Sequence, residues 1–402
     1  MDSFEAYLDK VTAKGANIVP GAIMAVVDSA GNYKYRKTAG YDGVAEDAKP
    51  VAFDQVAYIA SCTKLITSIA SLQIVERGLV KLDDPLDDQL PELAAQPIIQ
   101  QKQDETFEML KAKRSITLWH LLTHTSGATY AFMDPRLLAW RKSRGESPGI
   151  SGEGDVAKDC AYPRAYEAGE SWAYSTGLDW ASLLVSRLAQ SSFEEYVEEH
   201  IAKPLGITSF TWHLARKPAV AQKVMRMNTR QSDGVFVDSR KPFGPMDPKS
   251  EGGGGGMYAS VHDYTRVLSD LLKDQPVLLK RSSVDRLFTP QLVAGSNALV
   301  NLSKDQFAVK PALDNSLEGV SMNYTLGGLL LTEDVQRENY FKPKGTISWT
   351  GLPNMLWSIN RERGLALFIV LQTLPWADRR SFDLVARFET AVWRNMSELH
   401  LP

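Results

Sequence analysis

The chain has 402 residues, and its 45 Lys and Arg nearly balance its 48 Asp and Glu, so the formal net charge of −3 argues against a basic nucleic-acid surface. Its two cysteines, Cys62 and Cys160, are too few for a disulfide framework or a four-cysteine zinc site. The start of the chain lacks a secretory signal, and no apolar run approaches the roughly 20 residues of a membrane span, which predicts a cytoplasmic protein without membrane contact.

The predicted elements begin with a helix and a hairpin. Residues 4–14 carry apolar side chains at helical spacing, and a strand-like run follows at 22–28. The sequence Ser-Ala-Gly-Asn at 29–32 is typical of a turn, so a second strand is expected from Tyr33 onward.

The middle of the chain is expected to be mostly helical, because apolar residues recur three or four positions apart. The segments with this spacing are 64–77, 118–122, 178–188 and 193–201. Five glycines at 252–256 predict a flexible or tightly bending loop, and close approach of the backbone to a ligand is the alternative. Because this run does not complete the Gly-x-Gly-x-x-Gly pattern, it gives no support to nucleotide binding.

The last part of the chain returns to strands. The strand-like runs lie at 327–332, 345–350, 354–359 and 365–371. A closing helix is expected over 382–396, and elements of this kind at both ends of the chain suggest one antiparallel sheet covered by helices. We therefore predict one compact α/β (α+β) unit. Residues 1–75 and 225–402 form its sheet region, and a mostly helical region, 76–224, is inserted between them.

The strongest chemical signal is the sequence Ser61-Cys62-Thr63-Lys64, which lies between a strand-like run at 56–60 and an apolar helix. Side chains three residues apart on a helix share a face, with Cβ atoms about 5 to 6 Å apart. A serine hydroxyl becomes a nucleophile when a neighbouring base takes its proton, and a desolvated lysine can be that base. The helix start also offers the N–H of Ser61 to a developing oxyanion. The alternative is that Ser61 only caps the helix and that Lys64 is a surface charge.

Two later motifs complete the candidate site. The sequence Tyr-Ser-Thr at 174–176 precedes the predicted helix at 178–188, and a phenol at such a junction can shuttle protons beside a lysine. The sequence Ser-Trp-Thr-Gly-Leu at 348–352 ends a predicted strand, whose edge can donate a second N–H to the oxyanion. Each motif alone is also compatible with an ordinary structural role.

The order of these motifs resembles that of the serine β-lactamase and penicillin-binding-protein superfamily. Ser-x-x-Lys comes first, a tyrosine motif follows in mid-chain, and a Trp-x-Gly strand comes late. Within this superfamily, the chain is similar to class C β-lactamases, to family VIII carboxylesterases and above all to fungal acyltransferases of the lovastatin-transesterase type. The last resemblance extends over nearly the whole chain and implies a β-lactamase-like fold. The segments that carry it lie at 20–35, 58–84, 116–132, 178–185, 204–208 and 351–359.

The resemblance implies a role for each motif. Ser61 is the nucleophile, Lys64 and Tyr174 are the proton-transfer pair, and the N–H groups of Ser61 and Leu352 form the oxyanion hole. Which of Lys64 and Tyr174 acts as the base is left open, and we treat them as one coupled unit. The chain departs from the family where Thr176 replaces the Asn of the class C Tyr-x-Asn motif and where Trp349 replaces a lysine of the β-lactamases. Both losses remove groups that hold a β-lactam, so esters or thioesters are the expected substrates.

The expected function is that of an acyltransferase, which moves an acyl group from a thioester or ester through a Ser61 acyl-enzyme to a hydroxyl group. The resemblance suggests a polyketide or other natural product as the acceptor and a thioester of an acyl carrier protein or coenzyme A as the donor, with no metal or redox cofactor. A carboxylesterase that uses the same residues with water as acceptor is the alternative, since no motif encodes the exclusion of water. A non-catalytic scaffold protein is a third interpretation.

Several residues near these motifs have competing interpretations. His120 and His124 are four residues apart, but the Glu of His-Glu-x-x-His is missing, so this segment is expected to be structural and to shape the pocket floor. Ser171 lies in an incomplete Gly-x-Ser-x-Gly motif and is a weak alternative nucleophile.

Aromatic residues beside the motifs, Tyr130 among them, suggest a cleft for a bulky acceptor, although aromatic residues in loops usually pack locally. The substrate-binding candidates are Trp349, Thr350, Gly351, Trp172, Tyr258, Tyr324 and Trp376.

Overall fold

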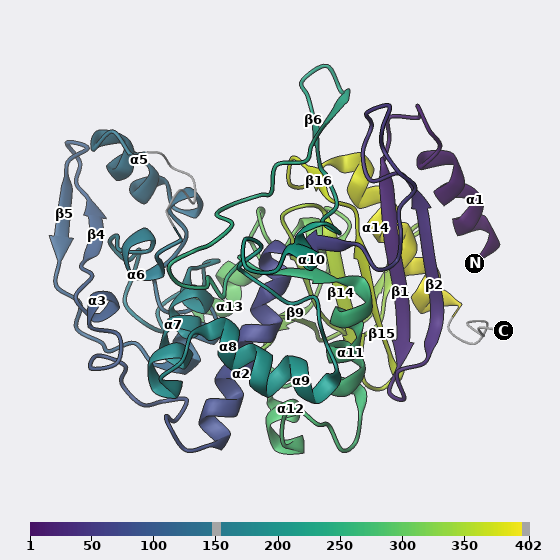
Figure 1. The fold of residues 1–402 in the computed structure, drawn as a ribbon. Helices are drawn as coiled ribbons and strands as arrows, with labels where there is room; N and C mark the ends of the chain where they lie inside the picture. Colours follow the sequence, from purple (N-terminus) through teal and green to yellow (C-terminus); the bar gives the residue numbers. More distant parts are fainter. Residues whose placement is uncertain (147–153, 396–402) are drawn as a thin grey trace.

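A computed structural model of the chain describes residues 1–146 and 154–395, and Met396, the expected end of the closing helix, lies outside them. At its centre lies an antiparallel sheet with the strand order β2–β1–β15–β14–β13–β10–β9 (Figure 1). These strands are β1 Gly21–Asp28, β2 Tyr33–Gly40, β9 Met322–Tyr324, β10 Leu329–Leu331, β13 Ile347–Gly351, β14 Met355–Asn360 and β15 Leu365–Val370. Ile23 of β1 pairs with Val370 of β15, so both ends of the chain share this sheet.

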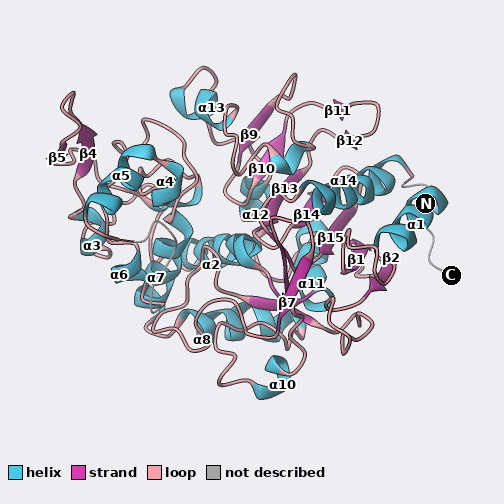
Figure 2. Cartoon of the chain, turned by 90° about the horizontal axis from the view of Figure 1, so that it is seen from above, coloured by secondary structure: helices cyan, strands magenta, loops and turns pink. Residues whose placement is uncertain are grey.

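Helices cover both faces of the sheet, because its central strands are apolar on both sides. Met24 and Val26 of β1 belong to a core with α1 (Asp2–Val11) and α14 (Arg379–Arg394). Ile23 and Ala25, which point the other way, belong to the larger core with α11 (Val261–Leu272) and α2 (Thr63–Glu76). Figure 2 shows α14 and α11 on opposite sides of the central strands. The sheet flanked by terminal helices, as expected from the sequence, is confirmed.

The segment between the two parts of the sheet carries helices and a hairpin. The helices are α3 Pro91–Ala94, α4 Leu118–Leu122, α5 Pro135–Ser143, α6 Val156–Asp159, α7 Gly177–Ala189, α8 Phe193–Val197, α9 Lys203–Leu205 and α10 Pro218–Ala221. The helix expected over 193–201 is α8 followed by a π-helical turn, Glu198–Ala202. The hairpin of β4 (Ile98–Gln101) and β5 (Phe107–Leu110) was not predicted, because most of its residues are exposed, the apolar Met109 and Leu110 included, and show no alternation with a buried face.

Smaller elements complete the fold around the sheet. They are β3 Val56–Tyr58, β6 Met227–Arg230, β7 Phe236–Ser239, β8 Tyr258–Ser260, β11 Val335–Gln336, β12 Phe341–Lys342, β16 Thr373–Leu374, α12 Arg281–Leu287 and α13 Asn297–Leu302. The strand expected over 56–60 ends earlier, at Tyr58, where the chain turns sharply into α2. Within the described ranges, no helix is both long and apolar enough to cross a lipid bilayer. Cys62 and Cys160 are both buried free thiols.

Candidate active site

Ser61 lies in a single 3-10 turn, Ala60–Cys62, that connects β3 to α2. Ala60 has φ of 45°, in the left-handed region that costs a residue with a Cβ about 1–2 kcal/mol. The turn leaves Ser61 partly exposed, whereas Cys62 and Lys64 are buried. A strained turn therefore presents the hydroxyl of Ser61 at the start of α2, one helical turn before Lys64.

The three residues predicted to do the chemistry lie together. The hydroxyl of Tyr174 donates a hydrogen bond to Ser61 Oγ at 2.6 Å. Lys64 Nζ lies 3.5 Å from the same oxygen and 4.6 Å from the centre of the Tyr174 ring. At these distances, Tyr174 or Lys64 can accept the proton of Ser61 once the accepting group is itself unprotonated, as general base catalysis requires.

Tyr174 is held by the segment 124–130, which runs antiparallel to residues 173–176. Thr129 and Ser175 form a β-bridge, and Thr129 Oγ1 donates to the carbonyl of Tyr174 at 2.9 Å. Thr176 Oγ1 donates to the carbonyl of Ala128 at 2.9 Å, so its hydroxyl is directed to the backbone. The segment 124–130 thereby fixes the position of the loop that carries Tyr174.

Lys64 has further partners that the sequence did not predict. Its amine donates to Tyr130 Oη at 3.2 Å and to the carbonyl of Gly254. Tyr130 in turn donates to Asp179 Oδ2 at 3.2 Å, and the N–H of Gly254 donates to Asp179 Oδ1 at 2.8 Å. Desolvation raises the pKa of Asp179, and the charge of Lys64 opposes that rise. The sequence feature that could have pointed to Asp179 is its place five positions after Tyr174, at the start of an apolar helix.

The glycines at 252–256 form a tight bend that packs against the protein itself. A Cβ at Gly253 would lie 2.5 Å from the carbonyl oxygen of Leu178, and one at Gly254 would lie 2.2 Å from Asp179 Oδ2. A Cβ at Gly256 would meet the Trp212 ring at 2.6 Å. Of the two expectations for this run, the structure shows the tight bend, and the backbone approaches side chains of the chain.

The segment expected to provide the second oxyanion donor lies beside the Ser61 turn. Leu352 follows β13, and a Cβ on its neighbour Gly351 would be 2.7 Å from the carbonyl oxygen of Ile59. The absence of a side chain at Gly351 therefore lets the end of β13 approach the residues before Ser61. The role of the Ser61 and Leu352 N–H groups as an oxyanion hole stays a prediction.

Three of the aromatic residues predicted to bind substrate lie around the ring of His124, which also contacts the ring of Tyr174. These three are Tyr324, Trp172 and Trp349. The His124 ring centre lies 5.0 Å from that of Tyr174, 5.2 Å from Tyr324, 5.9 Å from Trp172 and 6.3 Å from Trp349. Burial lowers the pKa of His124 well below its usual range, and the N–H of Ser175 donates to its Nδ1 at 3.2 Å. Trp349 Nε1 donates to Tyr174 Oη at 3.3 Å, so Tyr174 receives a hydrogen bond from this cluster.

The other predicted contact residues lie in different places. Thr350 is buried in β13, and Tyr258 is buried in β8, where its hydroxyl donates to the carbonyl of Phe243. Trp376 is partly exposed and donates to the carbonyl of Phe307 at 3.0 Å. Rings connect it to the site, since Phe307 lies 5.3 Å from Phe132 and Phe132 lies 5.3 Å from Tyr130.

The alternative site residues have separate structural partners. His120 Nδ1 lies 2.9 Å from the hydroxyl of Thr117 at the start of α4. His120 therefore caps a helix, whereas His124 lies behind Tyr174. Ser171 accepts a hydrogen bond from Asn301 Nδ2 at 2.7 Å. Among the described residues, no group of three or more His, Cys, Asp or Glu is arranged to hold a metal ion.

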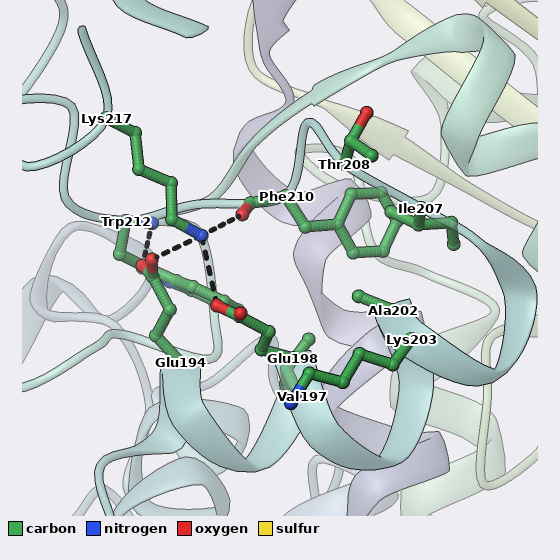
Figure 3. A pocket seen from close by; sticks show the side chains of 10 residues that line it. All are labelled: Glu194, Val197, Glu198, Ala202, Lys203, Ile207, Thr208, Phe210, Trp212 and Lys217. Atoms are coloured by element: carbon green, nitrogen blue, oxygen red, sulfur yellow. Dashed lines mark hydrogen bonds and ion pairs between the residues drawn. The ribbon is translucent and has the colours of Figure 1, made fainter. Parts of the chain in front are cut away.

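A cavity of about 300 Å³ lies on another part of the molecule, beside α8 and the π-helical turn (Figure 3). Lys217 at its edge is held by Glu194 at 3.0 Å, by Glu198 at 3.3 Å and by the carbonyl of Phe210 at 3.2 Å (Figure 3). These groups bind one another, and Ser61, the predicted nucleophile, does not line this cavity. The group around Ser61 therefore stays the candidate active site.

Comparisons with known proteins show the family and the fold of the chain. A profile of the beta-lactamase family matches residues 8–392. The acyltransferase calJ of Penicillium decumbens is 34% identical over 98% of this chain and 98% of its own length. Monacolin J acid methylbutanoyltransferase of Aspergillus terreus is 33% identical, covering 93% of this chain and 92% of that protein. Lovastatin esterase of Penicillium rubens is 31% identical over 98% of both chains. A mutant of simvastatin synthase from Aspergillus terreus superposes with a TM-score of 0.88, at 31% identity over 98% of this chain and 95% of that structure.

Proposed function

Because this chain belongs to the beta-lactamase family and has the β-lactamase-like fold expected from its sequence, we propose that it acts as a serine acyltransferase. It moves an acyl group from a thioester or ester to a hydroxyl group of a polyketide-like acceptor. Relatives named as acyltransferases match it over nearly their whole length, which supports transfer as the reaction.

The first half of the reaction transfers the acyl group to Ser61. The Oγ proton of Ser61 passes to the unit of Tyr174 and Lys64 while Oγ attacks the carbonyl carbon of the donor. The N–H groups of Ser61 and Leu352 bind the oxyanion that forms. The bond between the carbonyl carbon and the sulfur or oxygen of the leaving group then breaks, and the leaving group takes the proton back. A thioester on an acyl carrier protein or on coenzyme A fits this step, because a thiol leaves readily.

The second half reverses these roles with a new oxygen. A hydroxyl of the acceptor gives its proton to the same unit and attacks the acyl carbon, and Ser61 leaves with that proton. The ring series of Tyr130, Phe132, Phe307 and Trp376 offers an apolar wall from the site to the surface, which suits a bulky acceptor better than water.

The observation that carries the proposal is the hydrogen bond of 2.6 Å between Tyr174 and Ser61 Oγ, with Lys64 beside it. Its test is incubation of the protein with a small acyl thioester, with and without monacolin J acid, the acceptor named for one relative. We expect an acylated product and less free acid when the acceptor is present. Release of free acid that the acceptor leaves unchanged would contradict transfer.

Ester hydrolysis is the second candidate function, because the lovastatin esterase of Penicillium rubens is also a relative. The same acyl-enzyme would then be resolved by water. Lovastatin as the acyl donor distinguishes hydrolysis from transfer. A hydrolase releases the free acid from lovastatin at a rate that added alcohols do not lower. A transferase passes the acyl group to the added alcohol.

A further inference from the structure

Asp179 holds two of the groups that bind the amine of Lys64. Its Oδ1 accepts the N–H of Gly254, whose carbonyl accepts from Lys64 Nζ. Its Oδ2 accepts the hydroxyl of Tyr130, whose oxygen accepts from Lys64 Nζ at 3.2 Å. The third partner of the amine is Ser61 Oγ. One carboxylate therefore supports two of the three groups that hold this amine in the described part of the chain.

The chain is shaped to seat this carboxylate. A Cβ at Gly254 would lie 2.2 Å from Oδ2 of Asp179, and a Cβ at Gly252 would lie 3.0 Å from Oδ1. A Cβ at Gly255, in contrast, would meet its nearest neighbour only at 3.8 Å. Asp179 is also the third residue of α7, where the positive end of the helix dipole favours a negative charge.

Apart from Tyr174, the other titratable groups that face Lys64 and Asp179 are buried, and burial favours their neutral forms. Burial raises the pKa of the phenols and thiols among them and lowers the pKa of the imidazole. These groups are Tyr58, Tyr130, Tyr162, Cys62, Cys160 and His124. Tyr174 is the remaining one, and it donates to Ser61. Asp179 is thus the carboxylate that the described surroundings of Lys64 provide.

We propose that Asp179 is a positioning residue, which aims the Lys64 amine at Ser61 through Tyr130 and Gly254 and supplies the negative charge beside it. The inference rests on the function proposed above, because the direction of the amine matters only where Lys64 takes part in proton transfer. Both carboxylate oxygens act as acceptors here. Asn has a single acceptor oxygen, so its NH2 group would face either the N–H of Gly254 or the hydroxyl of Tyr130.

The test compares three variants of the full chain. Asp179→Asn removes the charge and one acceptor, and Tyr130→Phe removes one of the two links while keeping the ring. Asp263→Asn is the matched control, because Asp263 is also the third residue of a helix, α11, and accepts the N–H groups of Thr208 and Ser209 at 3.0 and 2.8 Å, away from Lys64. Rates with a small acyl thioester are expressed per active site, counted by labelling of Ser61 with a fluorophosphonate.

For Asp179→Asn we expect kcat per active site to fall about 100-fold, the effect of a misplaced catalytic group, with little change in the KM of the donor. The pH dependence of kcat should also change, because the variant removes a negative charge beside the groups that transfer the proton. Tyr130→Phe should show a smaller fall. Asp263→Asn should keep the rate per active site of the wild-type protein.

Equal rates per active site and equal pH profiles for Asp179→Asn and Asp263→Asn would overturn the positioning role. If Asp179→Asn does not fold, an unchanged rate and pH profile for Tyr130→Phe would overturn it instead. A wild-type protein without Ser61-dependent turnover would overturn the proposed function as well. A wild-type protein that turns over beside an unimpaired Asp179→Asn overturns the positioning role alone.

Discussion

At the residue scale, the oxygen of Tyr174 is the junction of the proposed proton pathway. It donates to Ser61 Oγ at 2.6 Å and accepts from Trp349 Nε1 at 3.3 Å. A donor to a phenol oxygen stabilises the negative charge that develops when the phenol gives up its proton. We therefore expect Trp349, which carries no charge, to affect the proposed proton transfer through this hydrogen bond.

Replacement of Trp349 by Phe tests this hydrogen bond. Loss of one hydrogen bond is worth about 1 kcal/mol, so we expect kcat to fall about fivefold. The control is Trp357→Phe, because Trp357 pairs with Trp349 on the adjacent strand and is as deeply buried. Both variants lose the same ring volume, so a fall in kcat that is equal in the two would contradict a specific role of Trp349. Stopped-flow measurement of thiol release gives the rates.

Residues close in sequence, or placed where a loop enters a helix, were the ones that the sequence could predict. Ser61 and Lys64 are one turn apart, and Tyr174 ends a loop before α7, so local pattern made them candidates and the family resemblance gave them their predicted roles. Asp179 and Gly254 were missed in this role. No local pattern links them, since they meet only when the glycine bend packs on the start of α7. Their contact depends on tertiary structure.

At the element scale, the bend at 252–256 fixes the distance between α2 and α7. Thr67 Oγ1 of α2 donates to the carbonyl of Gly253 at 2.9 Å, and the N–H of Gly253 binds Ser182 Oγ of α7 at 3.0 Å. The bend therefore lies between the helix that carries Lys64 and the one that carries Asp179. A residue with a side chain at its most crowded position would force these helices apart.

Two alanine variants within this bend make the point testable. Gly254→Ala would place a Cβ 2.2 Å from Asp179 Oδ2, whereas Gly255→Ala meets nothing nearer than 3.8 Å. Overpacking costs about 1 to 3 kcal/mol, so Gly254→Ala should lower the free energy of unfolding by that amount and reduce turnover. Gly255→Ala should leave both nearly unchanged. Urea unfolding and thioester turnover measure the difference, and equal behaviour of the two variants would contradict the packing described.

At the scale of the whole molecule, a buried ion pair joins α14 to the small β11–β12 hairpin, which is separate from the central sheet. Lys342 of β12 and Glu389 of α14 are 3.1 Å apart, with side chains 0% and 1% exposed. Lys342 also donates to Ser348 at 2.7 Å, and Tyr340 donates to Glu389 at 3.0 Å. Burial lowers the pKa of Lys342, and the charge of Glu389 opposes this.

Removing one partner of this pair leaves the other charge buried and unpaired. We therefore expect Lys342→Met to lower the free energy of unfolding by about 3 to 5 kcal/mol. Lys37→Met is the control, because its pair with Glu5 lies at the surface and is worth at most about 1 kcal/mol. Chemical denaturation measures the free energy of unfolding of both variants. A loss for Lys342→Met no larger than that for Lys37→Met would contradict a stabilising role of the buried pair.

The overall architecture followed from the pattern of strands at both ends of the chain, because strands buried on two faces are nearly continuous apolar runs. β6 and β7 were not predicted, since β6 is short and mostly polar, and β7 exposes the apolar side chain of Val237 instead of burying it. The division into a sheet region and a helical insertion stays a prediction.

The central claim, a Ser61 acyl-enzyme that passes its acyl group to an alcohol, is tested most directly by the mass of the intact protein. After mixing with an acyl thioester, the wild-type protein should gain the mass of one acyl group, and addition of an acceptor alcohol should remove it as the ester appears. Ser61→Ala should gain no mass while keeping its fold, because the hydroxyl contributes only about 1 kcal/mol to stability. An adduct that forms equally on Ser61→Ala, or one that the acceptor never removes, would contradict the mechanism.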